Sequence, residues 1–165
     1  MKTTFLNDNA EKNLQEVAEK YFQSRLEDLK FFERFNHVED EAEFVEALKD
    51  LDELEEIKDA IQHWETNTRE FHNYGLSFDK PEFPDFDESE DDDTEKEPYY
   101  RYQLGWGGPS DEIRFYEDGT IEYVYMDWFC GIGFDVSDVD GIEWLLDYFE
   151  SCDMINWDRD REEAY

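Results

Sequence analysis

The sequence predicts an α+β protein, and three observations support this fold class. Apolar residues recur at helical spacing through residues 1–76, an acidic stretch with three prolines follows at 77–98, and alternating aromatic and β-branched residues begin at Tyr99. We therefore expect a helical subdomain of two or three helices (1–76) and an acidic linker (77–98). The third part (99–165) should be a subdomain with a three-stranded antiparallel sheet and one packed helix.

The composition indicates a globular chain. Aromatic residues make up 18% of the 165 residues, far more than highly charged disordered segments contain. Rings in this number need a core in which they are buried. The length fits one domain, or two small subdomains that share an interface.

The first apolar stripe predicts a long amphipathic helix. It begins at about Asn9 and is interrupted at Asn36 and His37. Its apolar positions follow the three-and-four spacing that one buried face requires. These positions are Leu14, Val17, Ala18, Tyr21, Phe22, Leu29, Phe32 and Phe35.

A second apolar stripe runs from Phe44 to Phe71, and Gly75 supplies a stop. Its gaps of three or four predict helix throughout. One long helix and two shorter ones both fit, because Asp50 and Glu53 have capping-box spacing and could restart a helix there.

Residues 77–98 have the composition of a linker. Pro81, Pro84 and Pro98 exclude regular structure, and the carboxylates between them repel one another. The segment is then either a solvated spacer or a flexible acidic arm that contributes to binding. The residues of such an arm are Asp87, Glu88, Glu90, Asp91, Asp92 and Asp93.

From residue 99 the period changes to two. Residues 99–104, 112–116 and 120–127 read as three strands rich in Tyr, Ile and Val. Asp118 followed by Gly119 predicts a tight hairpin between the last two, because glycine accepts the positive φ that such a turn demands.

A final helix should cover one face of this sheet. Its predicted cap is Asp138 or Asp140, since a short acidic side chain can accept hydrogen bonds from the first helical N–H groups. The apolar positions that follow have helical spacing. They are Ile142, Trp144, Leu145, Tyr148 and Phe149.

The formal net charge of −33 comes from 48 Asp and Glu against 15 Lys and Arg. Self-repulsion on this scale destabilises a compact state and exceeds what solubility needs, so it suggests a strongly basic partner. We expect neither nucleic acid nor a membrane surface as a direct ligand, because both are anionic. With no apolar signal segment or membrane span, we also expect a cytoplasmic protein whose two cysteines, Cys130 and Cys152, are reduced and core-facing.

The strongest functional pattern is a ladder of carboxylates opposite the second apolar stripe. On a continuous helix its members would recur about every 5 Å along roughly 26 Å, which approaches the one charge per about 3.4 Å of a nucleic-acid strand. The alternative is a solvated polar face. The ladder consists of Glu39, Glu43, Glu46, Asp50, Glu53 and Glu56, flanked by Asp52, Glu55 and Asp59.

Patterns for catalysis and metal binding are weak. His37, His63 and His72 match no metalloprotease motif, and the carboxylates around Gly141 lack the spacing of an EF-hand loop. The glycines at 105–108 lack the downstream lysine of a phosphate-binding loop. We therefore expect no enzyme activity, no catalytic residue, no metal and no cofactor.

The segment YQLGWGGPSDEIRFYEDGTIEYVYMDWF (102–129), about one-sixth of the chain, resembles a stretch in small uncharacterised proteins of phages, plasmids and integrative elements. In overall acidic character the chain is similar to DNA-mimic inhibitors. The resemblance implies a protein that blocks restriction enzymes or CRISPR effectors, and it supplies no catalytic residue.

Two functions follow as hypotheses. The first is a stoichiometric inhibitor that occupies the basic nucleic-acid-binding surface of a host defence protein. The alternative is an acidic immunity or antitoxin protein that plugs the active site of one cognate toxin. An extended carboxylate array favours the first, whereas an aromatic pocket within an acidic patch favours the second. The residues expected to form that pocket are Tyr99, Tyr102, Trp106 and Trp128.

Overall fold

The computed structural model describes residues 8–35, 38, 41–51, 53–66, 71, 74–81, 97–128 and 130–163 and shows an α+β chain. None of the helices in these ranges is long and apolar enough to cross a membrane. The helical elements before the sheet are α1 (Asp8–Phe35), α2 (Glu41–Ala47), the 3-10 helix η1 (Leu48–Asp50) and α3 (Leu54–Thr66). The strands are β1 (Ser77–Asp79), β2 (Tyr99–Gly105), β3 (Ser110–Tyr116), β4 (Ile121–Asp127) and β5 (Cys130–Asp135), and α4 (Glu143–Ser151) and α5 (Trp157–Glu163) follow them.

The sheet has five antiparallel strands in the order β1-β2-β3-β4-β5, so the prediction of three strands is wrong. The three predicted strands correspond to β2, β3 and β4. The hairpin between β3 and β4 forms as expected: Gly119 has a φ of +89°, and the Thr120 N–H donates to Asp118 Oδ1 at 2.8 Å.

One missed strand lies in the predicted linker, and the other follows the third predicted strand. β1 falls inside the predicted linker, where it pairs with β2 and places the Phe78 ring 4.3 Å from that of Phe149. β5 contains Gly131 and Gly133, and glycine is unfavourable in the interior of a strand. Gly133 leaves room for the Glu122 carboxylate of β4, because a Cβ at this position would lie 2.5 Å from its Oε1.

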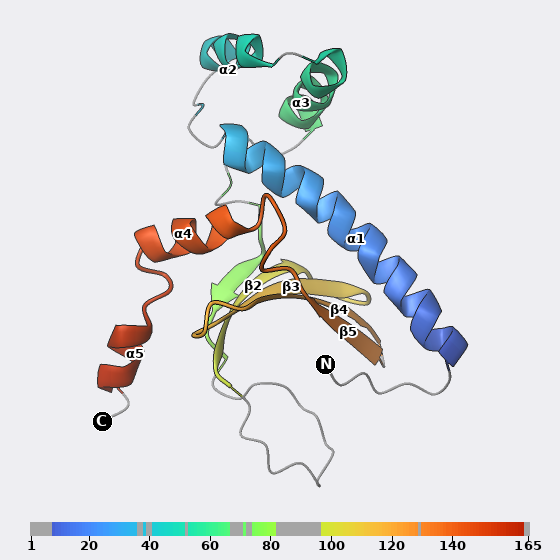
Figure 1. Ribbon diagram of the computed structural model, residues 1–165, viewed down its shortest axis with the longest axis vertical. Helices are drawn as coiled ribbons and strands as arrows, with labels where there is room; N and C mark the ends of the chain where they lie inside the picture. The colour runs from blue at the N-terminus through green and yellow to red at the C-terminus, as the bar shows by residue number, and fades with distance from the viewer. Residues whose placement is uncertain are drawn as a thin grey trace, which may run out of the picture.

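The helices gather on one face of the sheet, with α1 and α4 above it in Figure 1. Phe22 of α1 contacts the rings of Tyr123 (4.9 Å) and Phe134 (5.5 Å). Phe149 of α4 contacts Tyr102 (5.0 Å) and Phe115 (5.7 Å). One hydrophobic core therefore includes residues from both predicted subdomains.

The second apolar stripe folds as three short elements rather than one helix. The chain leaves η1 at Leu51, whose extended backbone (φ −91°, ψ 125°) turns its side chain into the core. Helix restarts at Leu54, where the Ile57 N–H donates to the Glu53 carbonyl at 3.2 Å. Of the two alternatives, the interrupted one is therefore confirmed.

The C-terminal part holds two helices instead of the single one expected. Neither Asp138 nor Asp140 caps α4, whose first residue follows Ile142 without a side-chain cap. Asp140 instead forms an ion pair with Lys30 of α1, with 2.9 Å between Nζ and Oδ2. The second helix, α5, is short and highly charged, and it packs through Trp157 on Tyr100.

Candidate functional site

The described members of the carboxylate ladder are all exposed. They lie on α2 (Glu43 and Glu46), in η1 (Asp50), in the connection to α3 (Glu53) and on α3 itself (Glu55, Glu56 and Asp59). Glu39 and Asp52 lie outside the described residues. The same holds for the whole predicted acidic arm: Asp87, Glu88, Glu90, Asp91, Asp92 and Asp93.

The ladder is not one straight row. Because the helix is interrupted at Leu51, its carboxylates are divided among α2, η1 and α3, and the expected constant spacing of about 5 Å does not extend across all of them. α2 and α3 lie side by side beyond the end of α1 in Figure 1. We call residues 41–51 and 53–66 the acidic helical unit.

Aromatic packing fixes which side of the acidic helical unit faces solvent. The Phe44 ring of α2 stacks on that of Trp64 of α3 at 4.2 Å with an interplanar angle of 7°. Phe44 also contacts Phe35 at the end of α1 at 5.2 Å. With these rings buried, the carboxylates point outward from a preformed support.

Cations relieve part of the repulsion in this unit. Lys49 pairs with Glu46 and Lys58 with Glu55, both at a spacing of three. Arg34 of α1 approaches Glu56 at 3.7 Å, a contact between elements that the helical periodicity did not indicate. The relief is partial, because the sequence from 41 to 66 contains ten acidic residues and two basic ones.

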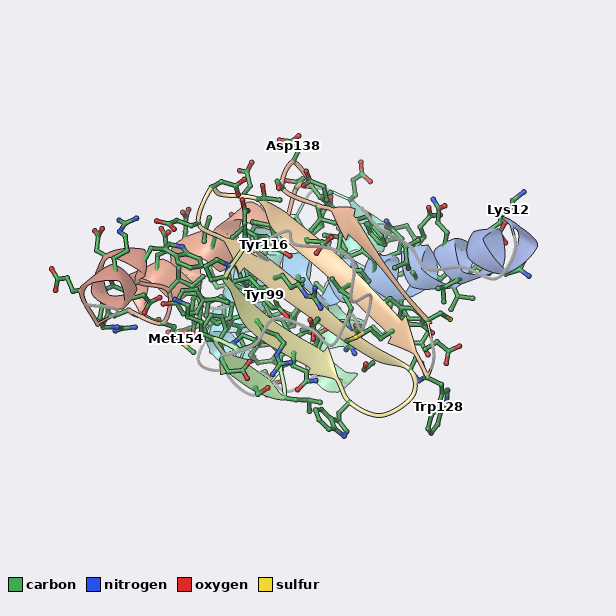
Figure 2. All side chains as sticks on the ribbon, turned by 90° about the horizontal axis from the view of Figure 1, so that it is seen from below. Lys12, Tyr99, Tyr116, Trp128, Asp138 and Met154 are labelled. Carbon is green, nitrogen blue, oxygen red and sulfur yellow. The ribbon has the colours of Figure 1, made fainter. Side chains whose placement is uncertain are left out.

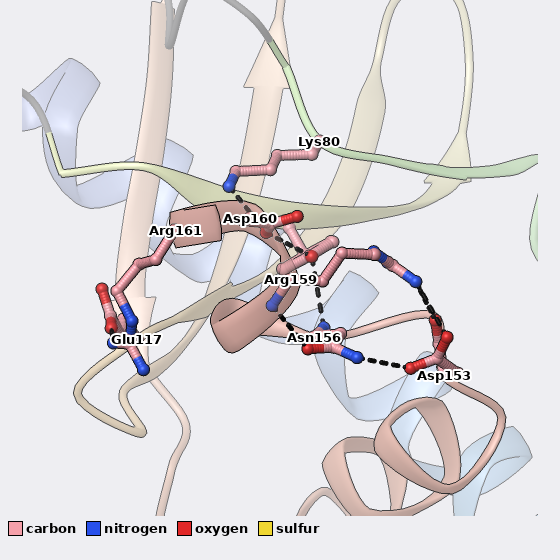
Figure 3. Close-up of polar contacts among 8 residues, drawn as sticks. Lys80, Glu117, Asp153, Asn156, Arg159, Asp160 and Arg161 are labelled. Carbon is pink, nitrogen blue, oxygen red and sulfur yellow. Dashed lines mark hydrogen bonds and ion pairs between the residues drawn. The ribbon is translucent and has the colours of Figure 1, made fainter. Parts of the chain in front are cut away.

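Across the described residues, most basic side chains pair with the chain's own carboxylates. At least ten of the fifteen form ion pairs with Asp or Glu. Figure 3 shows one such group around α5, where Lys80 pairs with Asp160 at 2.7 Å and Arg159 with Asp153 at 2.8 Å. The net negative charge that remains is therefore carried by carboxylates at the surface.

A part-buried ion pair joins α1 to the sheet. Arg25 donates from Nε to Asp111 Oδ2 at 2.8 Å and from Nη2 to Oδ1 at 3.0 Å, and the Tyr123 hydroxyl donates to Oδ2 at 3.0 Å. Burial, followed by the Asp111 charge, raises the pKa of Tyr123, so its hydroxyl stays protonated. With its oxygens engaged in this way, Asp111 holds the helix in place and has the features of a structural contact.

A smaller acidic surface lies beside the β3–β4 hairpin and was not singled out from the sequence. It surrounds a pocket of about 200 Å³ lined by Glu97, Tyr116, Asp118, Thr120, Glu122 and Asp135. Hydrogen bonds from Thr120 and Ser137 lower the pKa values of Asp118 and Asp135, respectively. Among the described residues, no group of His, Cys, Asp and Glu is arranged to hold a metal ion.

The four aromatic residues expected to form a pocket do not come together. Tyr102 packs in the core against Phe71 at 5.8 Å, whereas Tyr99, three positions earlier on β2, lies on the opposite face of the sheet. Trp106 and Trp128 are exposed. Figure 2 shows Tyr99 within the sheet and Trp128 projecting from one end of it.

The two cysteines do not face the core as expected. Cys130 and Cys152 are both exposed and form no disulfide. The distinctive chemistry of the described surface is therefore its carboxylates and a pair of exposed tryptophans.

Comparison with protein-family models, with curated proteins and with solved structures finds no match for this chain.

Proposed function

We propose that this chain is a stoichiometric inhibitor that occupies the basic nucleic-acid-binding surface of a host defence protein, either a CRISPR effector or a restriction enzyme. The acidic helical unit carries this proposal. It presents exposed carboxylates on three successive elements, supported by the stacked rings of Phe44 and Trp64. A protein surface that binds phosphates also attracts carboxylates in such an array.

The interruption at Leu51 changes the shape of the carboxylate array that would imitate nucleic-acid phosphates. A duplex presents its phosphates on two strands that curve around an axis, and a straight row would meet only part of a groove shaped for them. The bend divides the carboxylates between Glu43 and Glu46 on α2 and a second set on α3. This bent array of carboxylates fits a partner whose basic channel curves around a duplex.

In this proposal the chain has no catalytic residue, metal or cofactor, and it acts in the cytoplasm, where nucleic-acid-directed defence proteins work. The raised pKa of Tyr123 and the bidentate geometry of the Arg25–Asp111 pair favour a structural role for this ion pair. An aromatic pocket would favour the antitoxin alternative, but Tyr99 and Tyr102 lie on opposite faces of the sheet and do not line one pocket together.

Competition measures this function directly. The immobilised chain is offered a panel of purified restriction endonucleases and CRISPR effectors, and each retained protein is titrated with the chain against its labelled nucleic acid. Replacement of Glu43, Glu46 and Glu53 by Gln and of Asp50 by Asn should raise the inhibition constant at least about tenfold. These residues are exposed, so the fold should persist.

A matched control separates a specific site from total charge. Asp138 and Asp147 are changed to Asn, and Glu150 and Glu162 to Gln, which removes four exposed carboxylates elsewhere. Inhibition should then change little. Equal losses in both variants would assign the effect to net charge alone, and retained proteins whose nucleic acid is never displaced would overturn the proposal.

Deletion of residues 88–97 should raise the inhibition constant less than the four-residue variant does, because a flexible arm loses entropy when it is ordered on binding. The reverse result would make the acidic arm the ligand.

A further inference from the structure

Two large aromatic side chains project from the same end of the sheet. Trp106 is 79% exposed and Trp128 is 78% exposed, whereas most rings of this chain lie in its core. Trp106 belongs to the β2–β3 connection and Trp128 to the β4–β5 connection. In an antiparallel meander these alternate connections lie at one end, and we call residues 106–109 and 128 the tryptophan tips.

The tryptophan tips are built against each other. Gly108 leaves space for the Trp128 indole, since a Cβ at residue 108 would lie 2.4 Å from Cε2 and 2.6 Å from Nε1 of that ring. Gly107 next to it has a φ of +117°. The Trp128 indole therefore rests on the backbone of the neighbouring hairpin, and its position is set before any partner binds.

Trp128 also has a backbone conformation that is unfavourable for a bulky residue. Its φ of +39° lies in the left-handed region, where a two-residue hairpin normally has Gly, Asn or Asp. A bulky side chain there costs on the order of 1 kcal/mol or more, and a ring that is 78% exposed gains little from burial to offset this cost. Strain combined with exposure indicates a contact surface, and tryptophan is the residue most enriched at energetically dominant contacts.

Charge indicates what such a surface contacts. Neither connection contains Lys or Arg, and Asp127 precedes Trp128 in a chain with a net charge of −33. A second copy of this chain would be repelled, whereas a basic surface would be attracted. Tryptophan is the best aromatic partner for a cation, and the planar arginine guanidinium stacks on its face better than the lysine ammonium does.

We propose that the tryptophan tips bind arginine side chains of the basic partner, with guanidinium groups stacked on the indoles of Trp106 and Trp128. This inference rests on the proposed function for its partner and adds a second type of contact to it. The acidic helical unit contributes long-range attraction that salt screens, and the tips contribute short-range contacts that select arginine over lysine.

The test uses two defined probes, nona-arginine and nona-lysine, titrated into the full chain at one fixed salt concentration. The parent should prefer nona-arginine, and W106A/W128A should reduce this preference about fivefold, which corresponds to roughly 1 kcal/mol of cation–π contact. The four-residue variant of the acidic helical unit should weaken both peptides alike and keep the preference. M154A, at the opposite end of the molecule in Figure 2, is the control and should change neither.

NMR of the parent gives a second readout that needs no tip variant. On addition of nona-arginine, the indole N–H signals of Trp106 and Trp128 should shift, and that of the buried Trp64 should stay. An undiminished arginine preference in W106A/W128A, or unshifted indole signals, overturns the inference while leaving the competition result for the proposed function intact. A dimeric parent that becomes monomeric in W106A/W128A would overturn it too, because the tips would then bind a second copy.

Discussion

At the scale of single residues, Asp111 joins α1 to the sheet. It accepts two hydrogen bonds from Arg25 and one from Tyr123, and its side chain is 3% exposed. Asp111→Asn should lower the free energy of unfolding by about 3 to 5 kcal/mol, because the guanidinium would remain buried without its counter-charge. Urea unfolding at neutral pH, followed by circular dichroism, measures this loss.

The control for Asp111 is another bidentate pair that is more exposed. Asp79 accepts from Arg101 at 2.9 and 2.7 Å, and its side chain is 45% exposed. Asp79→Asn should cost about 1 kcal/mol or less. If the two variants lose the same stability, Asp111 does not hold α1 on the sheet in the way described.

At the scale of elements, the Phe44–Trp64 stack holds the acidic helical unit together. Phe44→Ala would leave a cavity beside Trp64 and remove the contact with Phe35, at a cost of about 3 to 5 kcal/mol. Hydrogen exchange should then increase in residues 41–66 more than in β3 and β4. Val45→Ala, at a position that is 52% exposed, is the control; a uniform increase over the chain after Phe44→Ala would contradict the local role.

The sequence predicted elements wherever one periodicity dominated. α1 and the central strands β2, β3 and β4 have regular apolar patterns, and Gly119 specified their hairpin. β5 was missed because its glycines suit close tertiary contacts with β4, where Gly133 leaves room for the Glu122 carboxylate. α5 was missed because its seven residues carry no apolar stripe and are held largely by ion pairs such as Lys80–Asp160.

The candidate site was likewise predicted where helical spacing determined it and missed where tertiary contacts did. Exposure of Glu43, Glu46 and Glu53 followed from the apolar stripe opposite them. The sequence left the interruption at Leu51 as one of two alternatives, because this leucine continues the helical spacing and only packing against the core selects the extended backbone. The tryptophan tips depend on two hairpins meeting, a contact between positions twenty residues apart.

At the scale of the whole molecule, buried tyrosines set the alkaline limit of stability. Burial raises the pKa values of Tyr74, Tyr102, Tyr116 and Tyr123. Above about pH 10 the unfolded chain loses phenolic protons that the folded chain keeps, so the free energy of unfolding should fall as pH rises. Urea titrations on either side of pH 10 measure the slope; unchanged stability across this range would contradict it.

Net charge makes a second prediction at this scale. A charge of −33 attracts a basic surface from beyond the roughly 8 Å Debye length of physiological salt. Association with nona-arginine, followed by stopped-flow tryptophan fluorescence, should therefore slow markedly as salt is added. A rate that does not depend on salt would remove electrostatic steering from the proposed function.

The length of α1 has a consequence for affinity. Its Tyr21 packs on Tyr125, three residues from Trp128, while its last residue, Phe35, contacts the acidic helical unit. The fourteen residues between these contacts correspond to about 21 Å of rigid helix. In the proposed function, the two surfaces form a bivalent ligand of fixed span, and a partner wide enough to touch both would hold the second at high local concentration once the first is bound. A narrower partner engages one surface at a time and gains no avidity.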